Sequence, residues 1–232
     1  MLKLTHFRLC PHSRSVRLVL GELQLEAELV EERPWEWRAQ FLALNPAGSL
    51  PVLERRPGGL VLCGAYAISE FLADEVTRHP IDGRSVPLFP GTNEDRAEVR
   101  RLVDWFHVKC HAEVTSELAV ERINPALEAK SGRPPSVETL RAVRSNLRYH
   151  LSYIDYLADS RRWLAGEELS FADFAAAAHI SVADYLGEVP WDEHASAKTW
   201  YARLKSRRSF RPLLADRLPG LPPPLAYTDL DF

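Results

Sequence analysis

The sequence predicts a two-domain α+β protein, in which a mixed N-terminal domain precedes an all-α domain. Three observations predict this architecture. Residues 1–78 contain short strand-like and helical segments in the order β-α-β-α-β-β-α. Residues 94–215 carry apolar side chains at helical spacing. Residues 79–93, rich in proline, glycine and polar side chains, are typical of a linker, and residues 216–232 form a proline-rich tail.

The elements of the first domain follow in order along the chain. Residues 2–7 alternate weakly and should form a strand that ends before Cys10. Ser13 is placed to cap a helix with an apolar stripe. This stripe consists of Val16, Val19, Leu20 and Leu23. A strand over 27–31 and a short helix over 34–44 should follow. The remaining predicted elements are a hairpin of residues 51–54 and 60–62 and a helix over 65–76.

The second domain is predicted from two helical stripes and one capping motif. The stripes consist of Val99, Leu102, Val103, Phe106 and Cys110, and of Leu140, Val143, Leu147, Leu151, Ile154 and Leu157. Ser170 can cap the next helix, and the Asp173 carboxylate can reach back to the Ser170 amide, as in a capping box. Because losing such a cap costs roughly 0.5–2 kcal/mol, we assign Ser170 and Asp173 a structural role.

The tail differs in character from the helical domain. Four prolines exclude a helix here and favour an extended, polyproline-like chain; they are Pro219, Pro222, Pro223 and Pro224. The last six residues, 227–232, are acidic and hydrophobic together. Two interpretations stay open, namely a strap over the helical domain and a short linear motif that docks on a partner.

Composition narrows the classes of function. A net charge of −3 predicts no nucleic-acid binding. Three cysteines without framework spacing suit a reducing compartment. The chain starts directly in a strand pattern, and no apolar run approaches the roughly 18 residues that span a bilayer. We therefore expect a soluble, cytoplasmic protein that binds neither nucleic acid nor membrane.

Several motifs together resemble the glutathione S-transferase superfamily across nearly the whole chain. They are Cys10-Pro-His-Ser-Arg14 with Val16-Arg17, Phe41-Leu-Ala-Leu-Asn-Pro46, Leu50-Pro-Val-Leu53, Ala67-Ile68 and the Ser170/Asp173 pair. The resemblance implies a thioredoxin-like first domain, an all-helical second domain and a homodimer.

The resemblance also implies a glutathione site of which part is missing. The family places a cis proline where this chain has Leu50-Pro51, and the exposed main chain there pairs with the cysteinyl part of glutathione. An acidic residue and a serine should hold the γ-glutamyl end, but the chain has Gly64 and Ala65. Hydrogen bonds to charged groups contribute roughly 1.5–3 kcal/mol each, so each loss weakens binding about ten- to a hundredfold. We expect little or no glutathione affinity and no other cofactor.

Cys10 stands where the resembled family carries its catalytic Ser, Tyr or Cys. A helix N-terminus lowers the pKa of a thiol, and a cysteine there suggests glutathione-linked thiol transfer. Since no second cysteine follows nearby, a redox cycle would need an external thiol. The missing glutathione contacts favour the other interpretation, an inherited cysteine without a chemical role in a protein that is not an enzyme.

One helix carries two histidines and a cysteine that could bind a metal ion. His107, Cys110 and His111 lie about one turn apart, but zinc needs three or four ligands and no matching pair is evident elsewhere. We therefore expect no metal, and we expect Cys110 and Cys63 to be core residues.

Two features predict an interaction surface. Trp35 and Trp37 are too close in sequence for both to point inward, so one should pack and the other should be exposed. Tryptophan is a favoured interface anchor. The glutamates at 113, 117 and 121 are spaced four apart and predict an acidic ridge next to Arg122, either a solvated face or a docking surface.

A finer resemblance is to bacterial transferase-like proteins that bind FtsZ filaments and support cell division without conjugation chemistry. It depends on 35–37, 109–122 and the tail ending in Asp231-Phe232. The leading expectation is a non-catalytic, dimeric adaptor for FtsZ at the division site. Its expected contacts are Trp35, Trp37, Glu117, Arg122, Asp229, Asp231 and Phe232. The alternatives are a glutathione-dependent thiol transferase that uses Cys10 and a non-catalytic carrier of hydrophobic ligands.

Overall fold

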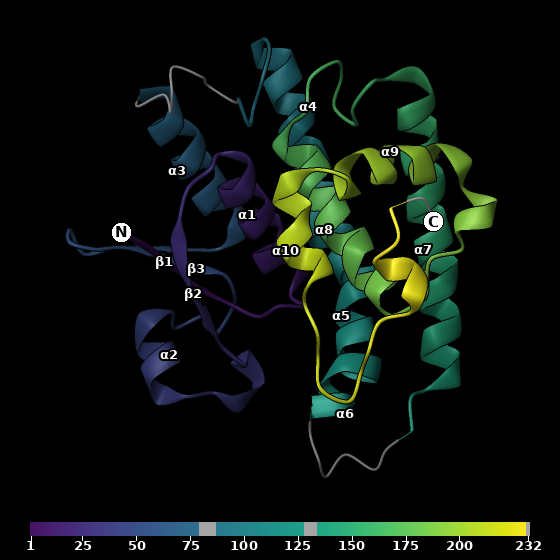
Figure 1. The fold of residues 1–232 in the computed structure, drawn as a ribbon, viewed down its shortest axis with the longest axis horizontal. Coiled ribbons are helices and arrows are strands. Elements are labelled where there is room, and N and C mark those ends of the chain that lie inside the picture. Colours follow the sequence, from purple (N-terminus) through teal and green to yellow (C-terminus); the bar gives the residue numbers. More distant parts are fainter. Residues whose placement is uncertain (79–86, 128–133, 231–232) are drawn as a thin grey trace.

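Two differently built halves lie side by side in the protein (Figure 1). The computed structural model describes residues 1–78, 87–127 and 134–230. The first half combines a small sheet with helices, and the second half is helical, as the sequence predicts. No helix in the described ranges is both long and apolar enough to cross a membrane.

The first domain is built on a four-stranded mixed sheet. Its strands are β1 (Leu2–His6), β2 (Ala27–Glu31), β3 (Val52–Arg55) and β4 (Leu60–Cys63). They are arranged in the order β2-β1-β3-β4, with β1 and β2 parallel and the other neighbours antiparallel. In the register of the central strand, Leu4 lies opposite Leu29 on one side and Leu53 on the other. Leu4 and Leu53 are buried, so the middle of the sheet contributes directly to the core.

Three helices and one short 3₁₀ turn complete this domain in the predicted order. They are α1 (Pro11–Glu22), η1 (Pro34–Glu36), α2 (Ala39–Leu44) and α3 (Ala65–Arg78). The expectation that Ser13 caps α1 is wrong. Pro11 begins the helix directly after Cys10, because proline suits the first helical position. Ser13 lies inside the first turn, where its hydroxyl accepts a hydrogen bond from the Phe7 N–H at 3.4 Å.

A continuous helical rod opens the second domain, and two stretches of it are π-helical. Its segments are α4 (Asn93–Asp104), η2 (Trp105–Thr115), α5 (Ser116–Leu118), η3 (Ala119–Ile123) and α6 (Asn124–Leu127). The π-helical stretches are η2 and η3. A π-helix hydrogen-bonds from i to i+5, so side-chain spacing along this rod departs from the α-helical period, and π-turns are frequent at functional sites.

The remaining helices of the second domain follow this rod. They are α7 (Val137–Ser160), α8 (Phe171–Tyr185), η4 (Trp191–Glu193), α9 (Ala195–Lys205), η5 (Arg208–Phe210), α10 (Arg211–Leu214) and η6 (Leu225–Tyr227). Every residue of α8 is buried, and the helix packs against α1, α4 and η2. The small side chains of Ala175–Ala178 let neighbouring helices approach closely. α8 therefore joins the two domains through one core.

The start of α8 carries the predicted link between Ser170 and Asp173. The Asp173 carboxylate accepts hydrogen bonds from the Ser170 N–H at 3.0 Å and the Leu164 N–H at 2.9 Å. It also accepts one from the indole N–H of Trp200 at 2.9 Å. Asp173 is completely buried, so this carboxylate ties the preceding loop and α9 to the first turn of α8.

The proline-rich tail lies over the helical domain as a strap, at least as far as residue 230 (Figure 1). Tyr227 anchors it and is fully buried. Its hydroxyl donates to the Leu213 carbonyl at 2.9 Å and accepts from the Arg14 guanidinium at 3.1 Å. Arg14, itself fully buried on α1, also pairs with Asp216 at 3.2 Å. The tail is therefore bound to both domains.

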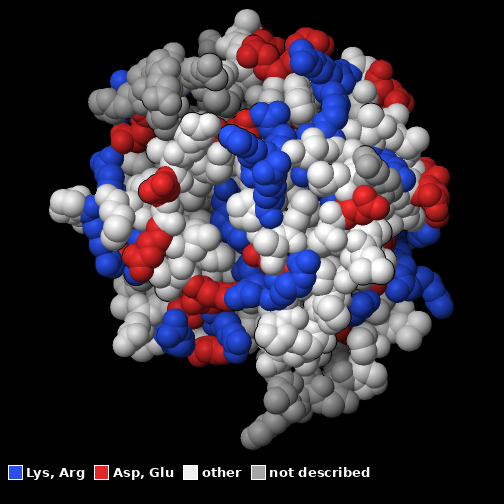
Figure 2. Space-filling model, in the orientation of Figure 1, with Lys and Arg blue, Asp and Glu red and all other residues white. Residues whose placement is uncertain are grey.

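Charged side chains of both signs are interleaved on the face shown in Figure 2. Many of the arginines pair with carboxylates, as in Arg100 with Glu70 and Arg148 with Glu193, each at 2.7 Å. Exposed pairs of this kind contribute about 0–1 kcal/mol each, so their main effect is to balance the surface field. The described part of this face carries no broad patch of one sign.

Candidate functional site

Cys10 lies at the junction between the first strand and α1, as the residue that caps the helix. It is half-buried, and desolvation raises the pKa of its thiol more than nearby hydrogen bonds from Ser13 and His12 lower it. The expectation of a lowered pKa is therefore wrong, because desolvation of the thiolate outweighs the helix N-terminus. At neutral pH the side chain is a thiol, which is a poor nucleophile.

The other two cysteines differ from each other. Cys110 is completely buried among apolar residues of the helical domain, and burial raises the pKa of its thiol, so the prediction of a core residue is confirmed. Cys63 is exposed at the end of β4, and its placement in the core is wrong. In β4 the side chains alternate between half-buried and exposed, and Cys63 falls on the exposed side.

The residues that the resemblance assigns to a glutathione-site remnant lie on two adjoining turns. The Leu50–Pro51 peptide bond is cis, and the Pro51 carbonyl accepts the Gly64 N–H at 3.0 Å. Leu50 is only 6% exposed, so its main chain is less open than the resemblance implies. Gly64 has φ of +89°, a conformation that side-chain-bearing residues rarely adopt, and Ala65 begins α3. The main-chain frame is therefore present, while no carboxylate or hydroxyl is supplied by Gly64 or Ala65.

The two tryptophans divide as the sequence predicts. Trp35 packs edge-on against Phe7, with ring centroids 5.1 Å apart. Trp37 is 66% exposed, and its backbone has a positive φ of +48°. This left-handed conformation ends the η1 turn and directs the chain toward α2. Trp37 is thus a large apolar side chain held on the surface by local backbone geometry.

The predicted acidic ridge is not continuous. Glu113 pairs with Lys109 and lies 3.0 Å from the His150 ring, and Glu121 is buried and accepts the Ser136 N–H at 2.7 Å. Glu113 and Glu117 are half-exposed, but of the three glutamates Glu113 is held in an ion pair and Glu121 is buried. The prediction of a ridge assumed α-helical spacing, which the π-helical stretches of the rod interrupt.

Arg122 and the tail lie near each other. Arg122 pairs with Glu188 at 2.5 Å, and the neighbouring Gly187 approaches the Pro224 ring. Asp229 is exposed on the same tail. Asp231 and Phe232, two of the predicted contacts, lie outside the described residues. Sequence reasoning overlooked Leu225, which is 93% exposed two residues before the buried Tyr227 anchor.

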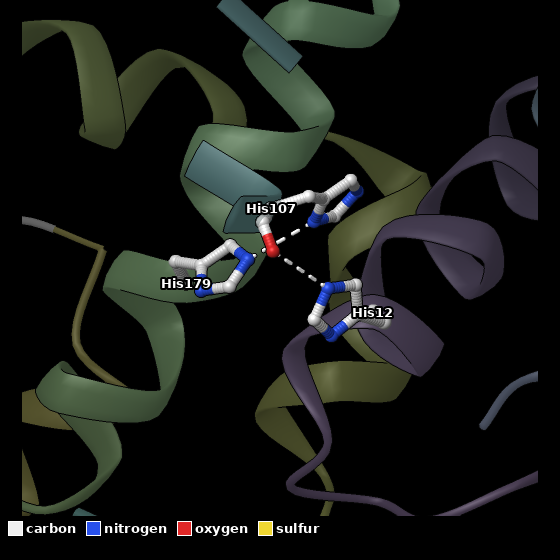
Figure 3. Close-up of side chains that lie close together, drawn as sticks. All are labelled: His12, His107 and His179. Atoms are coloured by element: carbon white, nitrogen blue, oxygen red, sulfur yellow. Dashed lines mark hydrogen bonds between the residues drawn. The ribbon is translucent and has the colours of Figure 1, made fainter. Parts of the chain in front are cut away.

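Three histidines meet at the junction of the domains, which the sequence did not predict (Figure 3). His12 comes from α1, His107 from η2 and His179 from α8, and one nitrogen of each lies within 4.8 Å of the others. The Nδ1 atom of His107 is 3.0 Å from Nε2 of His179. Nε2 of His12 is 3.0 Å from the main-chain carbonyl oxygen of His107. The sequence indicates His107 together with Cys110 and His111 as metal candidates, but not His12 or His179, because these two lie on distant elements.

Burial keeps this cluster neutral. Desolvation lowers the pKa of His12, and it lowers those of His107 and His179 well below the ordinary value. The neighbouring His111 has its pKa lowered to about 4, chiefly by burial. These imidazoles are therefore uncharged at neutral pH and have a lone pair on one ring nitrogen each.

The fold and its motifs match known protein families. Residues 4–79 match the family model of the glutathione S-transferase N-terminal domain, and residues 114–208 match that of the C-terminal domain. The protein therefore belongs to the glutathione S-transferase family.

Individual relatives cover the whole chain. FtsZ-localized protein A of Caulobacter vibrioides is 46% identical over 231 residues, which cover 99% of this chain and 97% of that protein. The solved structure of FzlA from C. crescentus superposes with a TM-score of 0.92 at 45% identity, covering 100% of this chain and 99% of that one. The crystal structure of a glutathione S-transferase from Sinorhizobium meliloti gives a TM-score of 0.93 at 48% identity, covering all of both chains.

Proposed function

We propose that this protein is a non-catalytic adaptor of the glutathione S-transferase fold that binds FtsZ filaments and supports bacterial cell division. The observation that carries the proposal is the whole-chain identity of 46% with a protein named for its localisation with FtsZ. The proposed location is the cytoplasm, at the division site. In a homodimer, two equivalent weak contacts would reinforce each other on a filament through effective concentration.

The geometry of the glutathione-site remnant supports the non-catalytic part of the proposal. Burial raises the pKa of the Cys10 thiol, so little thiolate forms at neutral pH. Gly64 and Ala65 offer no side-chain oxygen to a γ-glutamyl group. A weakly nucleophilic thiol and a main-chain frame without side-chain acceptors support a role other than conjugation.

The exposed residues that would contact a filament come from both domains. Trp37 offers a large exposed ring on the first domain, and Leu225 offers an exposed apolar side chain on the tail. The exposed Asp229 and the half-exposed Glu117 add negative charge, and the half-exposed Arg122, which is paired with Glu188, adds a positive charge at the rim. Exposed tryptophan anchors next to charged residues are typical of protein interfaces.

Co-sedimentation with polymerised FtsZ tests the proposal. We expect the wild-type protein and Cys10→Ala to pellet equally with filaments. Trp37→Ala should weaken binding at least about tenfold, because truncation of an anchoring tryptophan costs more than about 1.4 kcal/mol. Tyr156→Ala, which truncates another exposed aromatic residue, is the matched control and should bind normally. Failure of the wild-type protein to pellet would refute the adaptor function.

A second candidate function is glutathione-dependent thiol transfer. The relative at 48% identity that is named a glutathione S-transferase, together with Cys10 at the start of α1, favours it. In that case the protein would reduce glutathione mixed disulfides, and Cys10→Ala would abolish turnover. The same variant therefore separates the two functions.

A further inference from the structure

The histidine cluster at the domain junction has the composition and spacing of a metal site. Zinc–nitrogen bonds are about 2.0–2.1 Å long, so two nitrogens on one tetrahedral ion lie about 3.3 Å apart. The 3.0 Å separation of His107 Nδ1 and His179 Nε2 is already close to this value. The widest separation in the cluster is at most 4.8 Å. The half-exposed His12 ring is stacked on the His107 ring, with centroids 4.6 Å apart, so it would have to move inward by about 1.5 Å and rotate to become the third ligand.

Hydroxyl groups hold two of the rings in the orientation that a metal needs. The Ser15 hydroxyl donates to the His12 carbonyl at 2.8 Å, so it can only accept a proton from His107 Nε2, 3.3 Å away. His107 therefore carries its proton on Nε2 and leaves Nδ1 free to coordinate. Thr115 Oγ1 lies 3.0 Å from His179 Nδ1 and can accept its proton when Nε2 coordinates. Such outer hydrogen bonds are regular partners of metal-bound histidine.

The electrostatics of the cluster also suit a metal ion. Metal binding requires neutral imidazole, and the His107 and His179 rings are buried, in surroundings that disfavour a charged ring. Three neutral ligands do not reduce the double positive charge of the ion, so an anionic fourth ligand such as hydroxide would be favoured. This favours an open site with three protein ligands over a closed structural one.

A cavity adjoins the cluster at His107. His107 lines a hollow of about 230 Å³ between the domains, together with Tyr66, Arg100 and Asp104. The hollow is partly open to solvent.

We propose that His12, His107 and His179 form a three-histidine site for a divalent transition metal, with Zn²⁺ as the best-fitting ion. Imidazole nitrogens suit zinc, copper, iron and nickel, and three of them with one open position match zinc sites in particular. The ion would join α1 of the first domain to η2 and α8 of the second. The proposal is independent of FtsZ binding.

The test uses the full-length protein without a histidine tag, after treatment with a chelator. Titration with Zn²⁺ should give one ion per chain, and Co²⁺ should give the visible absorption bands of a nitrogen-ligated, near-tetrahedral ion. The unfolding temperature should rise with Zn²⁺ concentration, because the ion binds only the folded state. His12→Gln keeps a donor for the His107 carbonyl and should lower the affinity at least tenfold, as should His179→Gln.

His194→Gln is the matched control, since it removes a buried histidine of the helical domain outside the cluster and should bind Zn²⁺ like the wild type. Circular dichroism and melting without metal show whether each variant is folded. Because His12 is half-exposed, His12→Gln should fold even if His179→Gln does not, so the test can still be decided. Absence of stoichiometric uptake by the wild type would overturn the proposal. Uptake that both cluster variants retain would overturn it too.

Discussion

Asp173 shows how much of this fold can depend on one side chain. Replacing it with alanine leaves the buried donors of Leu164 and Trp200 without their acceptor. Each unsatisfied buried donor costs about 1–3 kcal/mol, so we expect Asp173→Ala to lower the free energy of unfolding by about 3 kcal/mol or more. Urea denaturation measures this. Asp192→Ala, at an exposed position, should change stability little. An unaltered urea midpoint for Asp173→Ala would show that the carboxylate is dispensable.

Ala65 allows the lost glutathione grip to be tested directly. Its position at the start of α3 matches the place of a serine that holds the γ-glutamyl end in the resembled family. Ala65→Ser should therefore raise glutathione affinity about tenfold or more, since one hydrogen bond to a charged group contributes roughly 1.5–3 kcal/mol. Calorimetric titration compares it with the wild type, for which we expect little heat. Ala73→Ser on the same helix is the control, and equal affinities for all three proteins would contradict this interpretation.

At the scale of elements, the described part of the tail, residues 216–230, is held by the buried Tyr227. Lys205 adds to this anchor by donating to the Ala226 carbonyl at 3.2 Å. Tyr227→Phe keeps the ring but removes the hydroxyl that bonds Arg14 and Leu213. We expect faster hydrogen exchange over residues 216–230 and a loss of about 1–3 kcal/mol of stability, because a buried arginine loses a partner.

The control for the tail prediction is Tyr156→Phe, which removes a hydroxyl from a residue that is 69% exposed. It should leave exchange in the tail unchanged. If Tyr227→Phe exchanges as slowly as the wild type, the proline-rich segment is held by its other contacts and the hydroxyl is not the anchor. If Tyr227→Phe loosens the tail and the variant still binds FtsZ normally, the tail is not part of the proposed interface.

The elements that the sequence predicted correctly are those with local causes. Strand and helix order in the first domain follow from short patterns, and the exposure of Trp37 follows from its distance of two residues from Trp35. The prediction of an acidic ridge was wrong because Glu121 lies in a π-helical stretch, whose side-chain spacing differs from that of an α-helix. The histidine cluster and the Arg14–Tyr227 contact escaped prediction because their members lie far apart in sequence and meet only after the domains pack.

At the scale of the whole molecule, the junction between the domains is part of the core. α1 packs against α8, and both contribute completely buried side chains to it. Buried polar groups cross the same junction, among them Arg14, whose guanidinium lies 2.8 Å from the Ser181 hydroxyl. The two domains should therefore unfold together as one cooperative unit.

This shared junction makes the stability of the protein depend on pH. Burial holds the pKa of His107 and His179 well below 6.5 in the folded state. As pH falls below 6.5, these histidines take up protons in the unfolded chain but stay neutral in the folded protein. The free energy of unfolding is therefore highest above that pH and declines below it. Each fully buried histidine contributes a slope of about 1.4 kcal/mol per pH unit.

Metal-free urea denaturation between pH 7.5 and 5.0 should show this decline, and His179→Gln should reduce its slope. Ile180→Val, a core change on the same helix without a titrating group, should keep the wild-type slope, whereas a wild-type stability that is flat across this range would mean that the cluster is solvated.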